Sequence, residues 1–139
     1  MIPAYKTNVG ANKQSYCMIN GLSMTFVGFQ IGTGGCRDGQ PLTVNRNNTY
    51  LPGLVAEFDS SQVTVELASG TAIKVTCTVP GGTLATNVVS NIGIIAQVVG
   101  EPGTFLYAIS NFSDKFANIL AGSINAVFNK KRKGDDNDE

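Results

Sequence analysis

The chain has 139 residues, of which 42% are hydrophobic and 14% are charged. This length suits one domain that buries a core without disulfide or metal staples, while the charged fraction is well below the roughly 25% of an ordinary soluble domain. Lys and Arg together number ten, as do Asp and Glu, so the net charge is zero. The body of the chain lacks the clustered Lys and Arg that bind phosphate, which argues against a nucleic-acid partner.

The N-terminal third predicts an arm, a strand and a glycine-rich loop. Residues 1–20 are mixed and polar, which predicts an irregular N-terminal arm or one short element around residues 16–19. Residues 24–31 are rich in aromatic and β-branched residues and predict a strand. The glycines that follow predict loop as far as residue 41, with positive φ or close backbone packing at Gly32, Gly34 and Gly35.

Two hairpins are predicted in the middle of the chain. Residues 62–67 alternate apolar and polar side chains, a turn follows at 68–70, and a second alternating run places Ile73, Val75, Cys77 and Val79 on one face. This period of two predicts a sheet with one buried face. The second hairpin joins residues 88–99, broken near Gly93, to residues 104–109 through a turn at 100–103.

The C-terminal region fits two structures. Residues 112–128 carry apolar side chains at helical spacing, which favours a helix, yet part of the segment also alternates as a strand would. Gly122 weakens the helix by about 1 kcal/mol. The sequence therefore predicts a single mainly β domain over residues 21–128, a sandwich-like arrangement of antiparallel sheets with either a helix or a strand at its end. Residues 129–139 predict a charged, flexible tail.

The sequence contains no recognisable catalytic motif. The chain has no histidine, which removes Ser-His and Cys-His nucleophile pairs and every zinc site that uses histidine. The glycine cluster departs from the dinucleotide fingerprint, because its third glycine position is Arg37. We therefore predict no catalytic residues, no cofactor and no metal. No export signal or membrane span is visible, so the three cysteines are expected to be free, mostly buried thiols in a reducing cytoplasm.

One ordered series of segments is similar to a known family. A strand runs into a glycine-rich turn at residues 26–35, and the segments 49–51, 73–79, 90–95 and 103–109 follow in order. This series resembles the collar-type N-terminal domain of bacteriophage tail fibre proteins. The resemblance implies a virion structural protein that anchors a fibre to the tail or baseplate and is assembled in the host cytoplasm.

The same resemblance implies particular partners and contacts. The expected partners are other tail and baseplate proteins and further copies of the chain, with a trimer favoured and with neither nucleic acid nor membrane insertion. The residues expected in the core or in subunit contacts are Phe26, Phe29, Gly32, Gly34, Gly35, Ile92, Ile94, Phe105, Tyr107 and Ile109.

Two alternatives stay open. One is another virion structural role, such as a capsid decoration protein, a tail-tube component or a head–tail connector. The other is a carbohydrate-binding β module, which is discounted because the chain has no tryptophan and its four tyrosines are scattered along the sequence.

Overall fold

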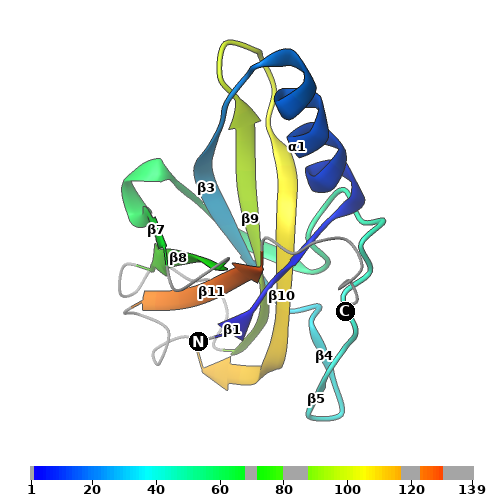
Figure 1. Ribbon diagram of the computed structural model, residues 1–139. Coiled ribbons are helices and arrows are strands. Elements are labelled where there is room, and N and C mark those ends of the chain that lie inside the picture. Colours follow the sequence, from blue (N-terminus) through cyan, green and yellow to red (C-terminus); the bar gives the residue numbers. More distant parts are fainter. Residues whose placement is uncertain (1, 68–71, 80–87, 117–122, 130–139) are drawn as a thin grey trace.

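The computed structural model of the protein describes residues 2–67, 72–79, 88–116 and 123–129 (Figure 1). Its strands form a five-stranded sheet in the order β2-β10-β9-β3-β6 and a four-stranded sheet in the order β1-β11-β8-β7. Figure 1 shows the strands of the two sheets running in crossing directions. All pairings within the two sheets are antiparallel except that of β1 with β11. The predicted mainly β fold is therefore confirmed.

The five-stranded sheet is built around two long neighbouring strands, β9 and β10. Its members are β2 (Tyr5–Lys6), β10 (Phe105–Phe116), β9 (Val88–Val98), β3 (Met24–Gly32) and β6 (Leu54–Asp59). The predicted hairpin of β9 and β10 is confirmed. The predicted break at Gly93 is wrong, because Gly93 lies in register between Gln30 and Ile109. An alanine there would crowd Leu106, since its methyl group would fall 2.7 Å from Leu106 Cδ1.

The four-stranded sheet contains the other predicted hairpin. Strands β7 (Val63–Leu67) and β8 (Ala72–Thr78) are antiparallel, and the turn predicted between them lies outside the described residues. On β8 the alternation is confirmed, because Val75 and Cys77 are fully buried. A short 3-10 helix, η1 (Ser60–Gln62), carries the chain from β6 to β7 and so from one sheet to the other. Two further short strands, β4 (Cys36–Arg37) and β5 (Gln40–Pro41), form a small hairpin within the predicted glycine-rich loop.

The N-terminal region contains a 13-residue helix, where an irregular arm or one short element around residues 16–19 was predicted. Helix α1 (Asn8–Asn20) lies alongside β10 (Figure 1). Its N-cap is Thr7, whose Oγ1 accepts a hydrogen bond from the Gly10 N–H at 2.9 Å and donates one to the Leu106 carbonyl at 2.6 Å. Gly21 ends the helix in the left-handed conformation at φ 66°. Periodicity missed this helix because its buried residues are only Gly10 and Cys17.

The C-terminal region consists of strands in its described parts, so the helix favoured by periodicity is wrong there. Strand β10 extends to Phe116, and β11 (Ser123–Asn129) pairs with β8 on one side and with β1 (Ile2–Pro3) on the other. Pairing along the whole of β8 satisfies backbone groups that a helix would leave at a bare sheet edge, so tertiary context overrides the helical pattern. Residues 117–122 and the predicted tail at 130–139 lie outside the described residues.

The core occupies both faces of the five-stranded sheet. The main cluster lies between the sheets, where Phe29, Ile31 and Ile94 pack with Val75 and Cys77. A second cluster lies on the outer face and consists of Leu51, Leu106 and Ile109, with Val44 and Ile95 packed against it. The segment from Val44 to Leu51 therefore covers part of the outer face, and the uncovered remainder of that face holds the candidate site.

Candidate functional site

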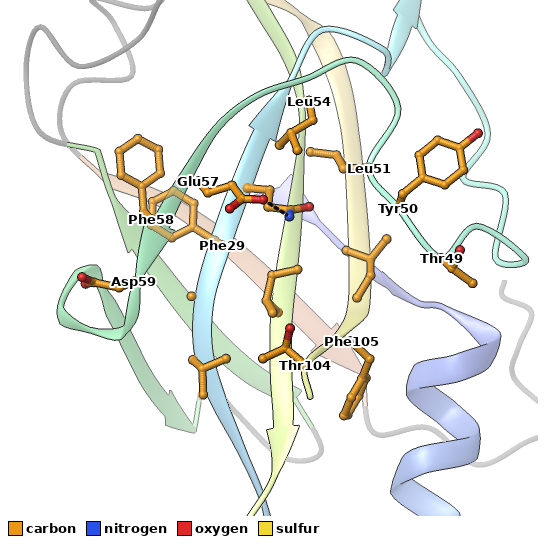
Figure 2. Close-up of a pocket in the computed structure, with 15 residues that line it drawn as sticks. Phe29, Thr49, Tyr50, Leu51, Leu54, Glu57, Phe58, Asp59, Thr104 and Phe105 are labelled. Atoms are coloured by element: carbon orange, nitrogen blue, oxygen red, sulfur yellow. Dashed lines mark hydrogen bonds between the residues drawn. The ribbon is translucent and has the colours of Figure 1, made fainter. Parts of the chain in front are cut away.

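An open groove lies on the outer face of the five-stranded sheet, between β6 and residues 49–51 (Figure 2). Its volume is about 560 Å³. Ile95 and Leu106 belong to its lining, and both also belong to or pack against the outer core cluster. The groove is therefore built on rigid, hydrogen-bonded strands, which is the setting in which a binding site keeps its geometry.

One side of the groove carries a pair of polar side chains. Gln30 on β3 and Glu57 on β6 are register partners, and Gln30 Nε2 donates a hydrogen bond of 2.9 Å to Glu57 Oε2. Gln30 points outward because its neighbours Phe29 and Ile31 point into the core and side chains alternate along a strand. The bond uses one carboxylate oxygen, so the second oxygen of Glu57 and the amide oxygen of Gln30 are further hydrogen-bond acceptors.

The β6 wall is held in place at two points. The Phe58 ring stacks on Phe29 with centroids 4.7 Å apart and an interplanar angle of 20°. Asp59 caps the 3-10 helix η1 by accepting hydrogen bonds from the Ser61 hydroxyl at 2.6 Å and the Ser61 N–H at 2.9 Å. These two bonds, that of the hydroxyl first, lower the pKa of the Asp59 carboxyl below its ordinary value. Asp59 is therefore held as a carboxylate with a structural task.

The opposite wall presents an exposed aromatic ring. Tyr50 is 67% exposed, while the next residue, Leu51, is 2% exposed and anchors the segment on Leu106. Figure 2 shows Tyr50 on the far side of Leu51 from Glu57 and Phe58, with its ring directed away from them. Leu54, at the start of β6, adds a further apolar side chain that is 45% exposed. The groove thus combines an exposed ring with hydrogen-bonding groups.

The charges in the groove are of one sign. Of the residues that the structure describes, its lining contains the carboxylates of Glu57 and Asp59 and no Lys or Arg. Among the residues that the structure describes, no group of three or more His, Cys, Asp or Glu side chains is placed to hold a metal ion. The groove can therefore offer acceptors and apolar surface to a neutral or cationic ligand.

The glycine cluster packs backbone against backbone. A methyl group on Gly34 would fall 2.6 Å from the Pro52 carbonyl oxygen, and one on Gly32 would fall 2.8 Å from the same atom. Gly35 donates a hydrogen bond of 2.9 Å to Ser90 Oγ. Asn91 Nδ2 also donates to the Pro52 carbonyl, at 3.0 Å. These contacts fix the loop that carries Tyr50, and they leave no room for a phosphate cradle.

The residues singled out from the sequence lie mainly in the core. Phe29, Ile92, Ile94, Tyr107 and Ile109 are buried, and Phe26 and Phe105 are partly buried against the same core. Phe29 and Phe105 contribute to the groove lining, but the exposed parts of the groove were missed. Two signals were available: Gln30 is the one polar residue between two inward-facing apolar ones, and Leu54 to Asp59 is a short run of strand-forming residues.

Comparisons with known proteins find little. No protein-family model matches the chain, and no solved structure matches it. Over 83 residues the chain is 36% identical to the major facilitator superfamily domain-containing protein 12 of Equus caballus. The matched segment covers 56% of this chain and 17% of that protein. The chain thus spans less than a fifth of the relative's length, so the similarity does not assign it to that family. In the described ranges, no helix is long and apolar enough to cross a membrane.

The interpretation as a phage tail protein is wrong. No tail fibre family matches the chain, and the similarity found is to a protein of the major facilitator superfamily. The anchoring function, the other virion structural roles and the location in a virion tail are overturned with it. The segments that suggested the family are short β strands and glycine turns, which any antiparallel β protein needs. Their order alone carried the resemblance.

Proposed function

We propose that the protein is a non-catalytic binding module whose groove takes a neutral polyhydroxylated ligand, a saccharide. The single observation that carries this proposal is that the exposed Tyr50 side chain and the hydrogen-bonded Gln30–Glu57 pair line the same groove.

The exposed ring supplies an apolar platform with a polar tip. Tyrosine combines a flat apolar face with a hydroxyl group, which suits ligands that are apolar on one face and hydroxylated at the edges. A pyranose ring has this character, since its C–H groups lie on its faces and its hydroxyls on its rim. The scatter of tyrosines along the sequence does not argue against a saccharide-binding site, because one exposed tyrosine at a groove can supply the aromatic contact.

The polar pair matches vicinal hydroxyl groups. A sugar hydroxyl both donates and accepts, and the pair offers an acceptor carboxylate beside an amide that does both. The hydrogen bond between Gln30 and Glu57 orients the two planar groups before any ligand arrives. Their directly opposed register on β3 and β6 keeps them within reach of one ligand.

The charge of the groove selects the ligand class. Two carboxylates and no cation in the lining disfavour phosphate, sulfate and acidic sugars, because a like charge entering a partly desolvated groove is repelled. Neutral saccharides remain compatible, and the Glu57 carboxylate strengthens each hydrogen bond that it accepts from a hydroxyl.

The same residues support binding without turnover. Glycoside hydrolysis uses two carboxyl groups that flank the scissile bond, one of them with a raised pKa. Here both carboxylates come from the same strand, and the hydrogen bonds from Ser61 lower the pKa of Asp59. Glu57 already accepts a bond from Gln30. This arrangement supports recognition in preference to catalysis.

The test is a titration of the isotope-labelled protein with a panel of neutral oligosaccharides, followed by NMR. We expect concentration-dependent shifts of amides on β3, β6 and residues 49–51, and their loss in Tyr50→Ala. Tyr16→Ala is the matched control, because Tyr16 is an exposed tyrosine outside the groove. A folded wild-type protein that shows no shifts with any sugar would overturn the proposal. Cleavage of a bound oligosaccharide would overturn its non-catalytic part.

A further inference from the structure

A cluster of exposed apolar side chains lies at the end of the molecule where α1 finishes. Met18 and Ile19 are 80% and 82% exposed, Val99 is 55% exposed and Leu22 is 37% exposed. These four residues are called the apolar end. Gly21 turns the chain from α1 toward β3, and the Val99 N–H donates a hydrogen bond of 2.9 Å to the Ser23 carbonyl. Figure 1 shows the end of α1 and the turn between β9 and β10 at the same end of the molecule.

Met18 and Ile19 bury little of their surface within the fold. Cys17 is the buried residue of the last turn of α1. Successive residues of an α-helix are rotated by about 100°, so Ile19 lies on nearly the opposite side of the helix from Cys17. Large apolar side chains gathered in one exposed area mark a contact with another molecule more often than scattered ones do.

A small hollow lies beside the apolar end. Its volume is about 200 Å³, and Val98, Pro102 and Phe105 supply its apolar lining. Lys13 and Glu101 line the same hollow and bring opposite charges. The Tyr16 hydroxyl donates a hydrogen bond of 2.6 Å to Glu101 Oε2, which connects α1 to this turn. Val98 of the hollow precedes Val99 of the apolar end in the chain, so the hollow borders the projecting apolar groups.

We infer that the apolar end is the contact between two copies of this chain, related by a two-fold axis, with Ile19 of each copy seated at the hollow of the other. A two-fold contact uses the same patch twice, so a patch must carry both the projection and the recess. This one does. The occupant is a second copy because the charges are self-complementary: Lys13 of one copy meets Glu101 of the other, and the reverse.

Two properties of the whole chain support the same occupant. Its net charge is zero, so two copies do not repel one another at a distance. Its charged fraction of 14% leaves much uncharged surface, which in proteins is often covered by a partner. A membrane surface is the weaker candidate, because only Lys13 among the residues around the hollow is basic, and interfacial helices carry several such residues. The hollow shares Thr104 and Phe105 with the groove, but neither the apolar end nor Lys13 and Glu101 line the groove, so variants at those residues test this inference apart from the saccharide proposal.

The experiment is a dilution series of the whole chain in which mass is measured by light scattering. We expect twice the monomer mass at high concentration, and for Ile19→Asp an association constant lowered at least a hundredfold. Asn12→Asp is the matched control, because it adds the same charge at an exposed position of the same helix and leaves the mass unchanged. Circular dichroism melting shows that each variant is folded.

A charge exchange separates a true contact from a folding effect. Lys13→Glu and Glu101→Lys should each weaken association at least tenfold, and the double exchange should restore it. A wild-type monomer at every concentration, a trimer, or an unchanged mass in Ile19→Asp would overturn the inference. Binding of the monomer to neutral lipid vesicles would likewise overturn it, in favour of a membrane surface as occupant.

Discussion

Gly10 of helix α1 lies directly against the carbonyl oxygen of Tyr107 on β10, so that any side chain at position 10 would overlap the backbone of the sheet. The Thr7 N–H donates a hydrogen bond of 2.9 Å to the same carbonyl. The helix therefore docks at the start of its first turn, where its backbone touches the edge of β10 without an intervening side chain. This contact sets the position of α1, and with it the position of the apolar end.

Gly10→Ala should destabilise the protein by about 1–3 kcal/mol, because the added methyl group overpacks a backbone contact that has no room to relax. Urea unfolding followed by circular dichroism measures the change. Asn12→Ala is the control, since its side chain is exposed on the same helix and such substitutions stay within about 0.5 kcal/mol. An equally stable Gly10→Ala would mean that α1 does not dock through this contact.

The hydroxyl of Thr7 should matter more than its methyl group. Thr7 is fully buried, and its hydroxyl caps α1 while donating to the Leu106 carbonyl. Thr7→Val keeps the shape and removes both bonds, so we expect a loss of about 1–3 kcal/mol in the free energy of unfolding. Thr7→Ser keeps the hydroxyl and should lose less than half as much. The reverse order of the two variants would contradict the capping role.

The strands were predictable from sequence where one face is buried and the other is not. Residues 73–79 and 24–31 show this, because alternation and β-branched content report burial on one side. Helix α1 was not predictable in this way, because it docks through Gly10 and a short cap and buries no apolar stripe. The C-terminal strand β11 was ambiguous because its pattern satisfied two periods, and only pairing with β8 decides between them.

The sequence held local signals at Gln30 and β6, but the assembly of the groove could not be predicted from it, for a geometric reason. One wall of the groove comes from β3 and β6, and the other comes from residues 49–51. No local sequence pattern indicates that these segments meet. The resemblance to a tail fibre family drew attention to residues such as Ile92 and Ile94, which lie in the core. Core residues are informative about the fold. The candidate ligand contacts are exposed positions such as Tyr50, where a β fold accepts many different residues.

The Gln30–Glu57 pair should contribute to binding and hardly at all to folding. Glu57 is exposed, so a single hydrogen bond there adds little stability, within about 0.5 kcal/mol. Gln30→Ala should lower saccharide affinity about tenfold, near 1.4 kcal/mol, because it removes a direct contact and the orientation of Glu57. Calorimetric or NMR titration of the two single variants and the double variant gives the coupling. Additive losses in this cycle would show that the two side chains act separately.

Alkaline pH should destabilise the fold through the buried Cys77 thiol. Burial raises the pKa of Cys77 from 9.0 to about 12. The folded state therefore holds its proton more tightly than the unfolded state does. The resulting stability is fully present below pH 9.0 and is lost as pH rises through about 12. Tyr107, whose pKa burial raises from 10.0 to about 12, acts in the same direction over the upper part of that window.

Urea unfolding at a series of pH values measures this loss. Cys77→Ala is less stable throughout, because it leaves a small cavity, but its stability should fall less steeply between pH 9.0 and about 12. Cys36→Ala is the control, since Cys36 is only partly buried. Parallel pH profiles for the wild type and Cys77→Ala would show that the Cys77 thiol does not contribute.

Gly93 offers a test of packing on the floor of the outer face. A methyl group at this position would fall 2.7 Å from Leu106 Cδ1 and 3.2 Å from Leu51 Cδ1, both of which are side-chain atoms. Gly93→Ala should therefore destabilise the protein by about 1–3 kcal/mol through overpacking. Leu106→Val shortens the side chain by one carbon and has no Cδ1, so the double variant should be more stable than the sum of the two single changes predicts. Strict additivity in urea unfolding would mean that the segment over β9 moves away to accept the methyl group, and Tyr50 would then be held less firmly at the groove.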